Sequence, residues 1–435
     1  GDFVGTWRQD AGGVDLLAYD AGWQSTPHGR PLSLSLPFTP GGMPHRGEMV
    51  RAYFENLLPD SQEIRARAAR RFRAKSTRAF DLLAEIGRDC VGALQILPDG
   101  QSPGDVRSID ATPLAEPEVA ALLRGAVAAP SMAGGMAADD DDFRISIAGA
   151  QEKTALAWID GRWCKPHGST PTTHILKLPM GLVGNLRLDL RHSIENEWLC
   201  ARIVAAFGLP VAECEPLQFE DLKVLAVQRF DRVWREGPSG RWLARLPQED
   251  CCQATGTPPD RKYESDGGPG IERIMGLLAN AEAPAADRRR FLLAQLLFWM
   301  LRAPDGHAKN FSLAIRPRGA YRLTPLYDVL SAWPLIGEGP GLLSEHKIRM
   351  AMAIRSTNAH WRMKEVHRRH WLALGQRYGV LGDAGQSFES VLDDWVTRTP
   401  RVLADIESSL PAGFPEEVAA PVLRGLERAA GLLAG

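Results

Sequence analysis

The chain has 435 residues, 44% of them hydrophobic and 24% charged, an ordinary composition for a globular protein of two or three domains. It carries 51 Lys and Arg against 53 Asp and Glu, so the whole molecule has no strong field that would draw it to nucleic acid or an acidic membrane. The longest apolar run, at residues 291–301, is too short to span a bilayer, and the sequence does not open on a basic region followed by an apolar core. Six scattered cysteines suggest neither a zinc site nor a disulfide framework, so we expect a soluble protein of the reducing cytoplasm without a membrane partner.

The part of the chain before residue 105 has the signals of a small mixed α and β unit. Helical periodicity is present in RGEMVRAYFENLLPD (46–60) and SQEIRARAARRFRAK (61–75), whereas VGALQIL (91–97) has the pattern of a strand. The arginines of the second segment could contact nucleic acid, but a solvated basic helix face is the favoured interpretation. The loops DGQSPGD (99–105) and GGMAADDDD (134–142) are the expected boundaries, with one short helix between them.

Strand signals dominate between residues 143 and 250, and helices dominate beyond about residue 270. The expected strands are FRISIAG (143–149), TALAWI (154–159), THILKLP (173–179), LAVQRFDRVW (225–234) and WLARLP (242–247), with a turn at 235–240. The expected helices are SIENEWLCARIVAAFG (193–208), IERIMGLLAN (271–280), DRRRFLLAQLLFWML (287–301) and PVLRGLERAAGLLA (421–434). A sheet-rich half followed by a helical half is the outline of a two-lobed α+β enzyme, although separate domains would give the same pattern.

The segment RAPDGHAKN (302–310) places Asp305 and Asn310 five positions apart, directly after a buried helix and before the strand-like FSLAIR. This is the D-x-x-x-x-N spacing of a kinase catalytic loop. An aspartate there can accept the proton of an attacking hydroxyl, and the amide oxygen of the asparagine can reach a magnesium ion on the nucleotide phosphates. The spacing alone is common by chance, so its position after the helix is what gives it weight.

A second acidic residue, Asp328, ends a short apolar strand expected within YRLTPLYDVLSAW (321–333), 18 residues after Asn310. Kinases place their other magnesium ligand at this point, normally in a D-F-G motif, and here the glycine is absent. The alternative is an aspartate that begins a turn or caps a helix.

Two features between residues 143 and 208 favour a phosphate site. Lys177 lies inside the strand THILKLP, where a buried lysine needs a carboxylate or a phosphate, and Glu197 on the following helix is the expected partner. The turn of FRISIAGAQEKTALAWI (143–159) is rich in small residues that let backbone N–H groups approach phosphates. The alternatives are a lysine that points to solvent and an ordinary hairpin.

These pieces follow one another in the chain order of a protein kinase. The motifs SIAGAQEKTAL, THILKLP, RLPQEDCCQ, KYESDGGPGI, DGHAKNFSL and LTPLYDVLSAW, together with RPLSLSLPF, FENLLPDS and FDLLAEIGRDCVGAL before them, resemble those of the HipA toxin kinases of bacterial toxin–antitoxin pairs. The resemblance runs from about residue 30 to residue 415, nearly the whole chain. It implies an α+β, two-lobed, protein-kinase-like fold with an extra N-terminal subdomain (1–105), a small lobe (106–250) and a mainly helical large lobe (251–435).

The resemblance also implies an activity: transfer of phosphate from ATP, with Mg²⁺, to a protein serine, with glutamyl-tRNA synthetase as the expected target and growth arrest as the result. A HipB-type helix-turn-helix antitoxin would hold the kinase in check and connect it indirectly to operator DNA. Asp305 is then the proton acceptor and Asn310 and Asp328 are the metal ligands. The residues expected around ATP are Ala148, Gly149, Ala150, Gln151, Glu152, Lys153, Lys177, Gln228, Arg229, Phe230, His307, Lys309, Asn310, Tyr327 and Asp328.

Gln228 departs from the acidic residue familiar at its position, but backbone contacts to adenine would survive that change. Ser146 matches the family's autophosphorylated serine, and a phosphate of about −1.5 to −2 charge there should expel the nucleotide loop and stop the enzyme. Two rival hypotheses are a nucleotide-binding corepressor that acts only with its antitoxin and a small-molecule kinase. His367 and His370 lie three apart in KEVHRRHW, but without a third ligand we expect them to be surface residues.

Overall fold

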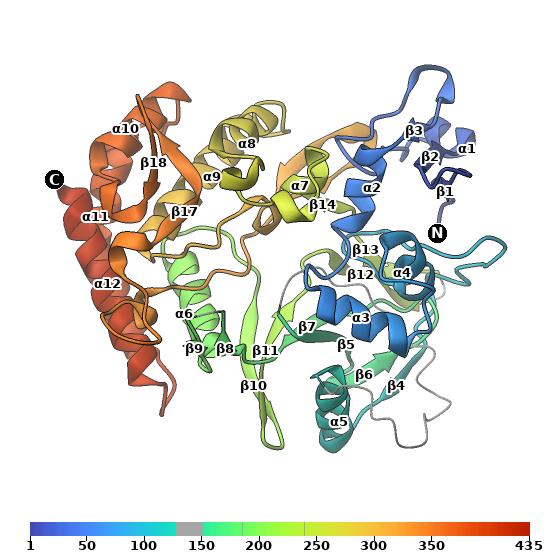
Figure 1. Ribbon diagram of the computed structural model, residues 1–435, viewed down its shortest axis with the longest axis horizontal. Helices are drawn as coiled ribbons and strands as arrows, with labels where there is room; N and C mark the ends of the chain where they lie inside the picture. Colours follow the sequence, from blue (N-terminus) through green and yellow to red (C-terminus); the bar gives the residue numbers. More distant parts are fainter. Residues whose placement is uncertain (128–150, 185, 239) are drawn as a thin grey trace. The chain divides into compact units, whose positions relative to one another are not determined.

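The computed structural model describes residues 1–127, 151–184, 186–238 and 240–435, which form two compact units (Figure 1). Unit 1 comprises Gly1–Leu178, Leu217–Asp260 and Leu313–Tyr321, and unit 2 comprises Pro179–Pro216, Arg261–Ser312 and Arg322–Gly435. Unit 1 therefore contains the whole predicted N-terminal subdomain, and unit 2 contains a stretch at 179–216 that the sequence assigned to the small lobe. The domain boundaries predicted at residues 105 and 250 stay predictions.

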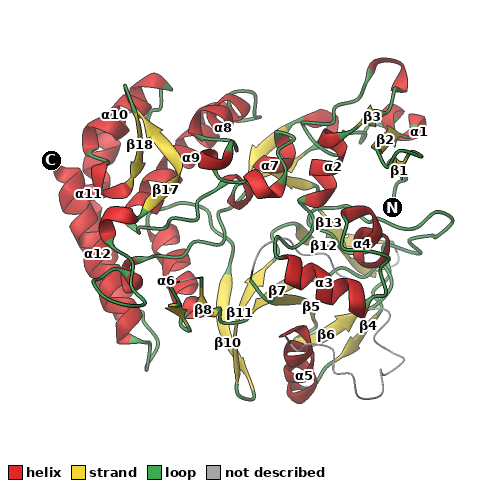
Figure 2. Ribbon diagram, in the orientation of Figure 1, coloured by secondary structure: helices red, strands yellow, loops and turns green. Residues whose placement is uncertain are grey.

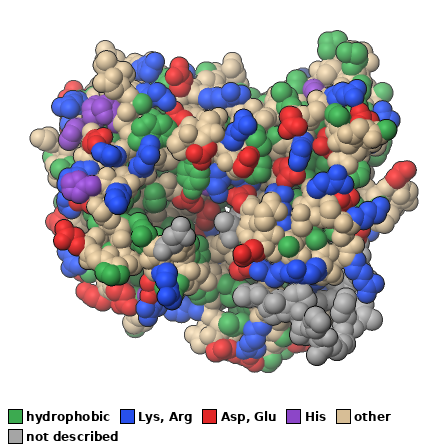
Figure 3. Space-filling model, in the orientation of Figure 1, with side chains coloured by type: hydrophobic (Ala, Val, Ile, Leu, Met, Phe, Trp, Pro, Cys, Tyr) green, Lys and Arg blue, Asp and Glu red, His purple; other side chains and the backbone are tan. Residues whose placement is uncertain are grey.

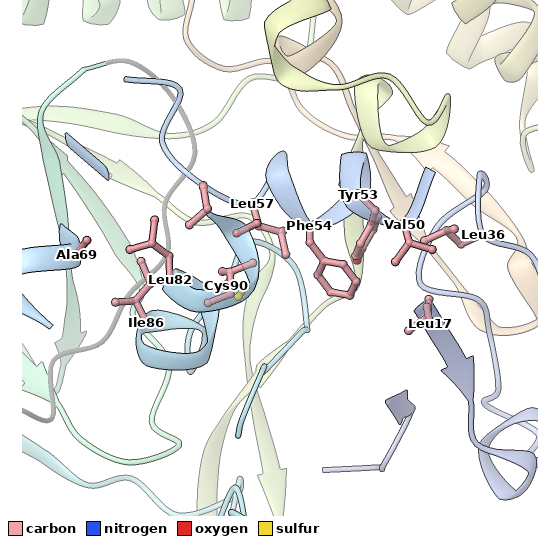
Figure 4. Packing of buried hydrophobic residues seen from close by; sticks show 13 residues of the cluster. Leu17, Leu36, Val50, Tyr53, Phe54, Leu57, Ala69, Leu82, Ile86 and Cys90 are labelled. Atoms are coloured by element: carbon pink, nitrogen blue, oxygen red, sulfur yellow. The ribbon is translucent and has the colours of Figure 1, made fainter. Parts of the chain in front are cut away.

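The N-terminal part of unit 1 is a small three-stranded sheet with short helices packed around one apolar core. Its strands are β1 (Gly5–Gln9), β2 (Asp15–Tyr19) and β3 (His45–Arg46), and its helices are α1 (Ala21–Ser25), α2 (Glu48–Glu55), α3 (Gln62–Arg71) and α4 (Ala79–Ile86). In Figure 4, Tyr53 and Phe54 of α2 lie near Leu17 of β2, and Leu82 and Ile86 come from α4. The periodic apolar positions of α2 thus form the buried face that the sequence predicted, and those of α4 form a second buried face.

The strand predicted at VGALQIL (91–97) is wrong: this segment has no regular secondary structure. Val91, Leu94 and Ile96 still pack against the N-terminal core, and the backbone N–H of Ile96 donates to the carbonyl oxygen of Gly87. The apolar pattern therefore reports burial, which a non-sheet segment can share with a strand.

The second sheet of unit 1 has six strands in the order β10-β11-β7-β5-β6-β4. These strands are β4 (Ala111–Pro113), β5 (Lys153–Ile159), β6 (Arg162–Pro166), β7 (His174–Lys177), β10 (Cys214–Phe219) and β11 (Leu222–Gln228). The helix α5 (Glu116–Val127) buries Val119, Ala120 and Leu123 against one face of this sheet. Successive side chains of a strand alternate between faces, so the other face is left for Lys153 and Lys177 and their neighbours.

The segment LAVQRFDRVW is two strands and not one. After β11 ends, residues 229–231 belong to no strand. The next strand, β12 (Arg232–Gly237), then pairs with β13 (Gly240–Arg245) in an antiparallel hairpin. Next come β14 (Gln248–Asp250) and α7 (Cys251–Ala254), and β15 (Ser312–Ile315) lies beside β14. Strand β16 (Tyr321–Leu323) follows β15 in the chain.

A buried cluster of five charged side chains joins the N-terminal subdomain to residues 229–231 and to the hairpin that follows them. Asp89 accepts hydrogen bonds from Arg229 (3.2 Å), Arg232 (2.9 Å) and Arg245 (3.0 Å). Asp231 accepts from Arg229 at 2.9 Å and from the backbone N–H of Gly92 at 2.7 Å. Although burial opposes ionisation, the arginines hold the pKa of both carboxyl groups below the usual range. Removal of one partner would leave a buried charge uncompensated, at a cost of about 3–5 kcal/mol.

Unit 2 is mainly helical, as Figure 2 shows. Its helices are α6 (Ser193–Ala206), α8 (Ile271–Leu278), α9 (Pro284–Met300), α10 (Arg368–Arg377), α11 (Phe388–Ser408) and α12 (Glu416–Ala434). Helix α9 is the centre of its core, since its residues from Phe291 to Met300 are all buried. Unit 2 also contains the hairpins β8 (Gly181–Val183) with β9 (Leu188–Leu190) and β17 (Arg349–Arg355) with β18 (Ala359–Arg362), which we did not predict.

Two expectations about surface residues need correction. His370 is buried and its ring stacks on that of His360 at 3.9 Å, whereas His367 is exposed. In the basic helix α3, Arg65 is buried and ion-paired with Glu55, so the arginines of this helix do not form one solvated face. On the face drawn in Figure 3, basic and acidic side chains are interspersed, as the near-zero net charge leads one to expect. None of the helices in the described part of the chain is long and apolar enough to cross a membrane.

Glu249 of β14 predicts a pH-dependent stability. Its fully buried carboxyl group accepts a hydrogen bond from the backbone N–H of Leu34 at 2.8 Å, and burial raises its pKa from 4.5 to about 8. Between these values the folded chain keeps a proton that the unfolded chain has lost, so this group makes folding less favourable as pH rises, by about 1.4 kcal/mol per pH unit. The substitution Glu249→Gln keeps the acceptor oxygen and does not titrate. In denaturant unfolding, the free energy of unfolding of the variant should therefore rise relative to that of the native chain between pH 5 and pH 8. Above pH 8 this difference should stay constant. The exposed Glu236→Gln is the control, and an equal difference for Glu249→Gln at pH 5 and pH 8 would contradict the assignment.

Candidate functional site

The predicted catalytic loop is a tightly hydrogen-bonded turn between α9 and β15 in unit 2. The backbone N–H of His307 and the side-chain amide of Asn310 both donate to the carbonyl oxygen of Asp305, at 2.8 Å and 2.6 Å. Gly306 is required here, because a Cβ atom on it would lie 2.1 Å from the ring of Phe298 in α9. Packing against the buried helix thus fixes the position of the loop. Because Asn310 lies five residues after Asp305, its side-chain amide can bond back to Asp305 across the turn.

The carboxylate of Asp305 is accessible and is held on one side only. Its side chain is 47% exposed. The hydroxyl of Tyr263 donates to Oδ1, and Nε2 of His307 lies 3.6 Å from the same oxygen. Among the described residues, no partner is seen for Oδ2. A carboxylate oriented through one oxygen and open at the other has the geometry of a general base.

His307 is buried beside this carboxylate with both ring nitrogens lacking a hydrogen-bond partner among the described residues. Burial lowers its pKa, and the charges of Asp305 and Asp328 offset this only in part, so the ring is neutral at pH 7. A buried polar group without a partner is costly. Its two nitrogens therefore indicate a place where a polar ligand binds, as expected for a residue near the nucleotide phosphates.

Asp328 is joined to the catalytic loop through the residue before it. The hydroxyl of Tyr327 donates to the carbonyl oxygen of Lys309 at 2.8 Å and is 2.6 Å from the hydroxyl of Ser312. Asp328 itself has a φ of +60°, a left-handed conformation that non-glycine residues adopt at a cost and that is common at functional sites. It lies in an irregular segment past β16 and not at the end of a strand as predicted.

The oxygens of Asn310 and Asp328 fit a magnesium ion. The amide nitrogen of Asn310 is committed to the carbonyl oxygen of Asp305, so its Oδ1 is the atom left to face a ligand. Carboxylate and amide oxygens are the hard donors that Mg²⁺ prefers.

In unit 1, Lys153 of β5 lies directly opposite Lys177 of β7, which in turn lies opposite Leu225 of β11. The register puts these side chains on the face away from α5, together with Ala155 and Val227 two residues along. Lys177 is buried, so the solvent-facing alternative does not hold. Two like charges directly opposite each other are destabilising unless an anion lies near them. An apolar face with two lysines suits a nucleotide base and its phosphates.

Several of the other residues predicted to surround ATP bind to groups of the protein itself. Gln151 donates to the carbonyl oxygen of Leu178, and Glu152 pairs with Arg67 of α3. Gln228 is exposed and Phe230 is half-buried, while the guanidinium of Arg229 is taken up by the buried cluster with Asp89 and Asp231. The backbone N–H of Arg229 also donates to the carbonyl oxygen of Thr173 at 2.8 Å, so only its carbonyl oxygen could accept a hydrogen bond from adenine.

Some predictions stay open in the structure. Ser146, Ala148, Gly149 and Ala150 lie outside the described residues. Glu197 is buried on α6 in unit 2 whereas Lys177 belongs to unit 1, so their pairing stays a prediction.

Tyr263 is the residue of this site that sequence reasoning missed. It belongs to the segment KYESDGGPGI, which contributes to the family resemblance but has no predicted role. Its ring also packs edge-on against His307, with centroids 4.9 Å apart. Tyr263 lies 42 residues before Asp305, so no local sequence signal shows that its hydroxyl reaches that carboxylate.

Two cavities in the structure lie away from these residues. One, of about 70 Å³, is lined by residues of β1, β2, α2 and α4. The other, of about 240 Å³, is lined by residues of β9, the starts of α6 and α12, and the segment 334–342. Neither is lined by Asp305, Asn310, Asp328 or the two lysines. The assignment of the candidate site is therefore based on the chemistry and hydrogen bonding of these residues and not on a cavity.

Comparison with known proteins supports the fold and the family. Residues 1–97 match the model of the HipA N-terminal domain, and residues 145–403 match that of the HipA-like C-terminal domain. The protein Y4mE of Sinorhizobium fredii is 33% identical over 96% of this chain and 95% of its own length. The serine/threonine-protein kinase toxin HipA of Shewanella oneidensis is 28% identical over 72% of this chain and 69% of its own.

Among solved structures, HipA from the Shewanella oneidensis complex of HipA, HipB and operator DNA aligns over 99% of this chain and 96% of its own, with a TM-score of 0.76 and 22% identity. This likeness confirms the predicted α+β, kinase-like fold. The chain therefore belongs to the HipA family of serine/threonine-protein kinase toxins.

Proposed function

We propose that this protein transfers the γ-phosphate of ATP to a serine hydroxyl of another protein, with Asp305 as the proton acceptor. The observation that carries this proposal is the partly exposed carboxylate of Asp305, which is oriented at Oδ1 by Tyr263. It lies in the same loop as Asn310, and this loop is linked through Tyr327 to Asp328. Mg²⁺ and ATP, when bound, supply the phosphoryl group and neutralise the charge that develops during its transfer.

The residues of the chain divide the work. Asp305 takes the proton of the serine hydroxyl as the oxygen bonds to phosphorus and the bond to ADP breaks. Asn310 and Asp328 hold the metal through oxygen atoms, and Lys153 and Lys177 hold the phosphates. His307 is neutral, and its ring nitrogens, which have no hydrogen-bond partner among the described residues, are placed to bind a phosphate oxygen. Since the chain performs little covalent chemistry itself, correct placement of these groups accounts for most of the catalysis.

The proposed substrate is glutamyl-tRNA synthetase, and the proposed regulators are a HipB-type antitoxin and autophosphorylation at Ser146. The motif resemblance supports the first and the third, and the HipA–HipB–operator complex of Shewanella oneidensis supports the second. Phosphorylation of the synthetase would halt translation and arrest growth. Operator DNA would be reached through the antitoxin.

The first experiment is intact-mass spectrometry of the protein with Mg²⁺ and ATP, with and without glutamyl-tRNA synthetase. The native chain should add phosphate to the synthetase, and Asp305→Ala should reduce the rate by roughly 10²–10⁴-fold, the usual contribution of a general base. Asp383→Ala, which changes an exposed carboxylate elsewhere in unit 2, is the matched control.

Each result selects one hypothesis. Phosphate on the native chain alone would keep the kinase and replace the synthetase by another target. No transfer to any protein, with ATP still bound, would overturn the proposal in favour of the corepressor. Transfer to a metabolite would favour the small-molecule kinase.

The role of Tyr263 is tested by Tyr263→Phe, which keeps the ring and removes the hydroxyl. A hydrogen bond to a charged group contributes about 1.5–3 kcal/mol, so kcat should fall roughly 10- to 100-fold. The KM for ATP should stay unchanged, because the hydroxyl contacts the base and not the lysines. Tyr378→Phe in unit 2 is the control, and a native kcat for Tyr263→Phe would show that the hydroxyl has no part in catalysis.

A further inference from the structure

Arg302 occupies an unusual position at the start of the catalytic loop. It follows the end of α9 and has a φ of +51°, in the left-handed region that glycine adopts without strain. An arginine there is less stable than a glycine, because its Cβ atom is crowded against the backbone in this conformation. Its side chain must therefore make interactions that offset this cost.

The guanidinium of Arg302 is 1% exposed and lies between two indole rings. Its central carbon is 5.2 Å from the ring centre of Trp299 in α9 and 5.1 Å from that of Trp333. Nη1 donates to the carbonyl oxygen of Trp299 at 2.9 Å, and Nη2 is 3.7 Å from Oε1 of Glu345. Glu345 also pairs with Arg428 of α12 at 3.1 Å. Desolvated cation–π contacts are among the stronger ones, and the carboxylate compensates the buried charge.

Trp333 belongs to a segment that caps the end of α9. The hydroxyl of Ser331, the backbone N–H of Ala332 and the indole N–H of Trp333 donate to the carbonyl oxygens of Leu301, Arg302 and Met300, at 2.6, 3.1 and 2.9 Å. These are carbonyl groups that a helix end leaves without an intrahelical partner. The segment begins three residues after Asp328, and Arg302, which follows the helix end, lies three residues before Asp305.

We propose that Arg302 is a positioning residue that clamps the loop of Asp305 and Asn310 to the segment of Asp328, through its stacking between Trp299 and Trp333 and its pairing with Glu345. This inference rests on the proposed function. Asn310 and Asp328 both lie between Arg302 and Trp333 in the chain, so both belong to the stretch that is closed by this clamp. Its loss changes the distance between the two metal ligands without removing either of them.

The backbone on both sides of the clamp is packed and cannot follow a change at Arg302 freely. A Cβ atom on Gly425 of α12 would lie 2.3 Å from the ring of Trp333, so the helix approaches that ring as closely as a glycine allows. Arg428 lies over the same ring at 5.9 Å. Packing against α12 thus fixes the position of Trp333. Arg302, which contacts Trp333, holds the start of the loop of Asp305 and Asn310 against it.

The test uses three variants: Arg302→Gly, which removes the guanidinium and relieves the backbone; Arg302→Lys, which keeps the charge; and Glu345→Gln, which removes the carboxylate charge. Binding of Mn²⁺ in the presence of a non-hydrolysable ATP analogue is followed by electron paramagnetic resonance. Loss of an outer partner of a metal site costs roughly 10–100-fold in metal affinity or activity, so half-saturation should shift at least tenfold in Arg302→Gly and less in the other two. The Mg²⁺ concentration for half-maximal kcat should rise in parallel, with the KM for ATP at saturating Mg²⁺ unchanged.

Arg318→Gly is the matched control, because Arg318 has a φ of +63° and is exposed in unit 1, so the same substitution there should leave metal binding unchanged. If Arg302→Gly does not fold, the other two variants decide. Native Mn²⁺ affinity in Arg302→Lys and Glu345→Gln would overturn the inference while the proposed function stands. Conversely, a native chain that binds Mn²⁺ and ATP but transfers no phosphate would overturn the proposed function, and the metal affinities would still decide the role of Arg302.

Discussion

The fold of unit 1 depends on a buried balance of charge: two carboxylates, Asp89 and Asp231, facing three guanidinium groups, Arg229, Arg232 and Arg245. Each of these groups would be costly to bury alone, so each requires the others. Asp89 comes from the N-terminal subdomain and the arginines come from the break after β11 and from the hairpin that follows. The N-terminal subdomain is therefore part of the support for the strands that carry Lys153 and Lys177, and it is not an independent appendage.

Unit 2 solves a different problem, which is to bring Asp305, Asn310 and Asp328 together from two separate loops. The buried helix α9 is the reference for both. Its packing against Gly306 shapes the catalytic loop, and its last carbonyl groups receive the segment that follows Asp328. The left-handed backbone at Arg302 and Asp328 shows where this arrangement stores strain, once just before the loop of Asp305 and Asn310 and once at Asp328 itself.

The sequence could predict those features whose signals depend on residues close together in the chain. The D-x-x-x-x-N motif, the buried helix before it and the periodic helices were found because their signals lie within a few residues. The strand expected at VGALQIL was wrong because burial against the core of the N-terminal subdomain gives the same apolar pattern as a sheet. Asp89, Tyr263 and Arg302 were missed because their roles depend on partners far along the chain, such as the 140 residues between Asp89 and Arg229.

The central claim, that Asp305, Asn310 and Asp328 form the phosphoryl-transfer site, is tested most directly by an experimental structure with Mg²⁺ and a non-hydrolysable ATP analogue. We expect a metal ion bound by Oδ1 of Asn310 and the carboxylate of Asp328, with the γ-phosphate facing Oδ2 of Asp305. A nucleotide bound elsewhere, such as in the cavity beside the starts of α6 and α12, or a metal ion without Asn310 and Asp328 as ligands, would contradict the claim.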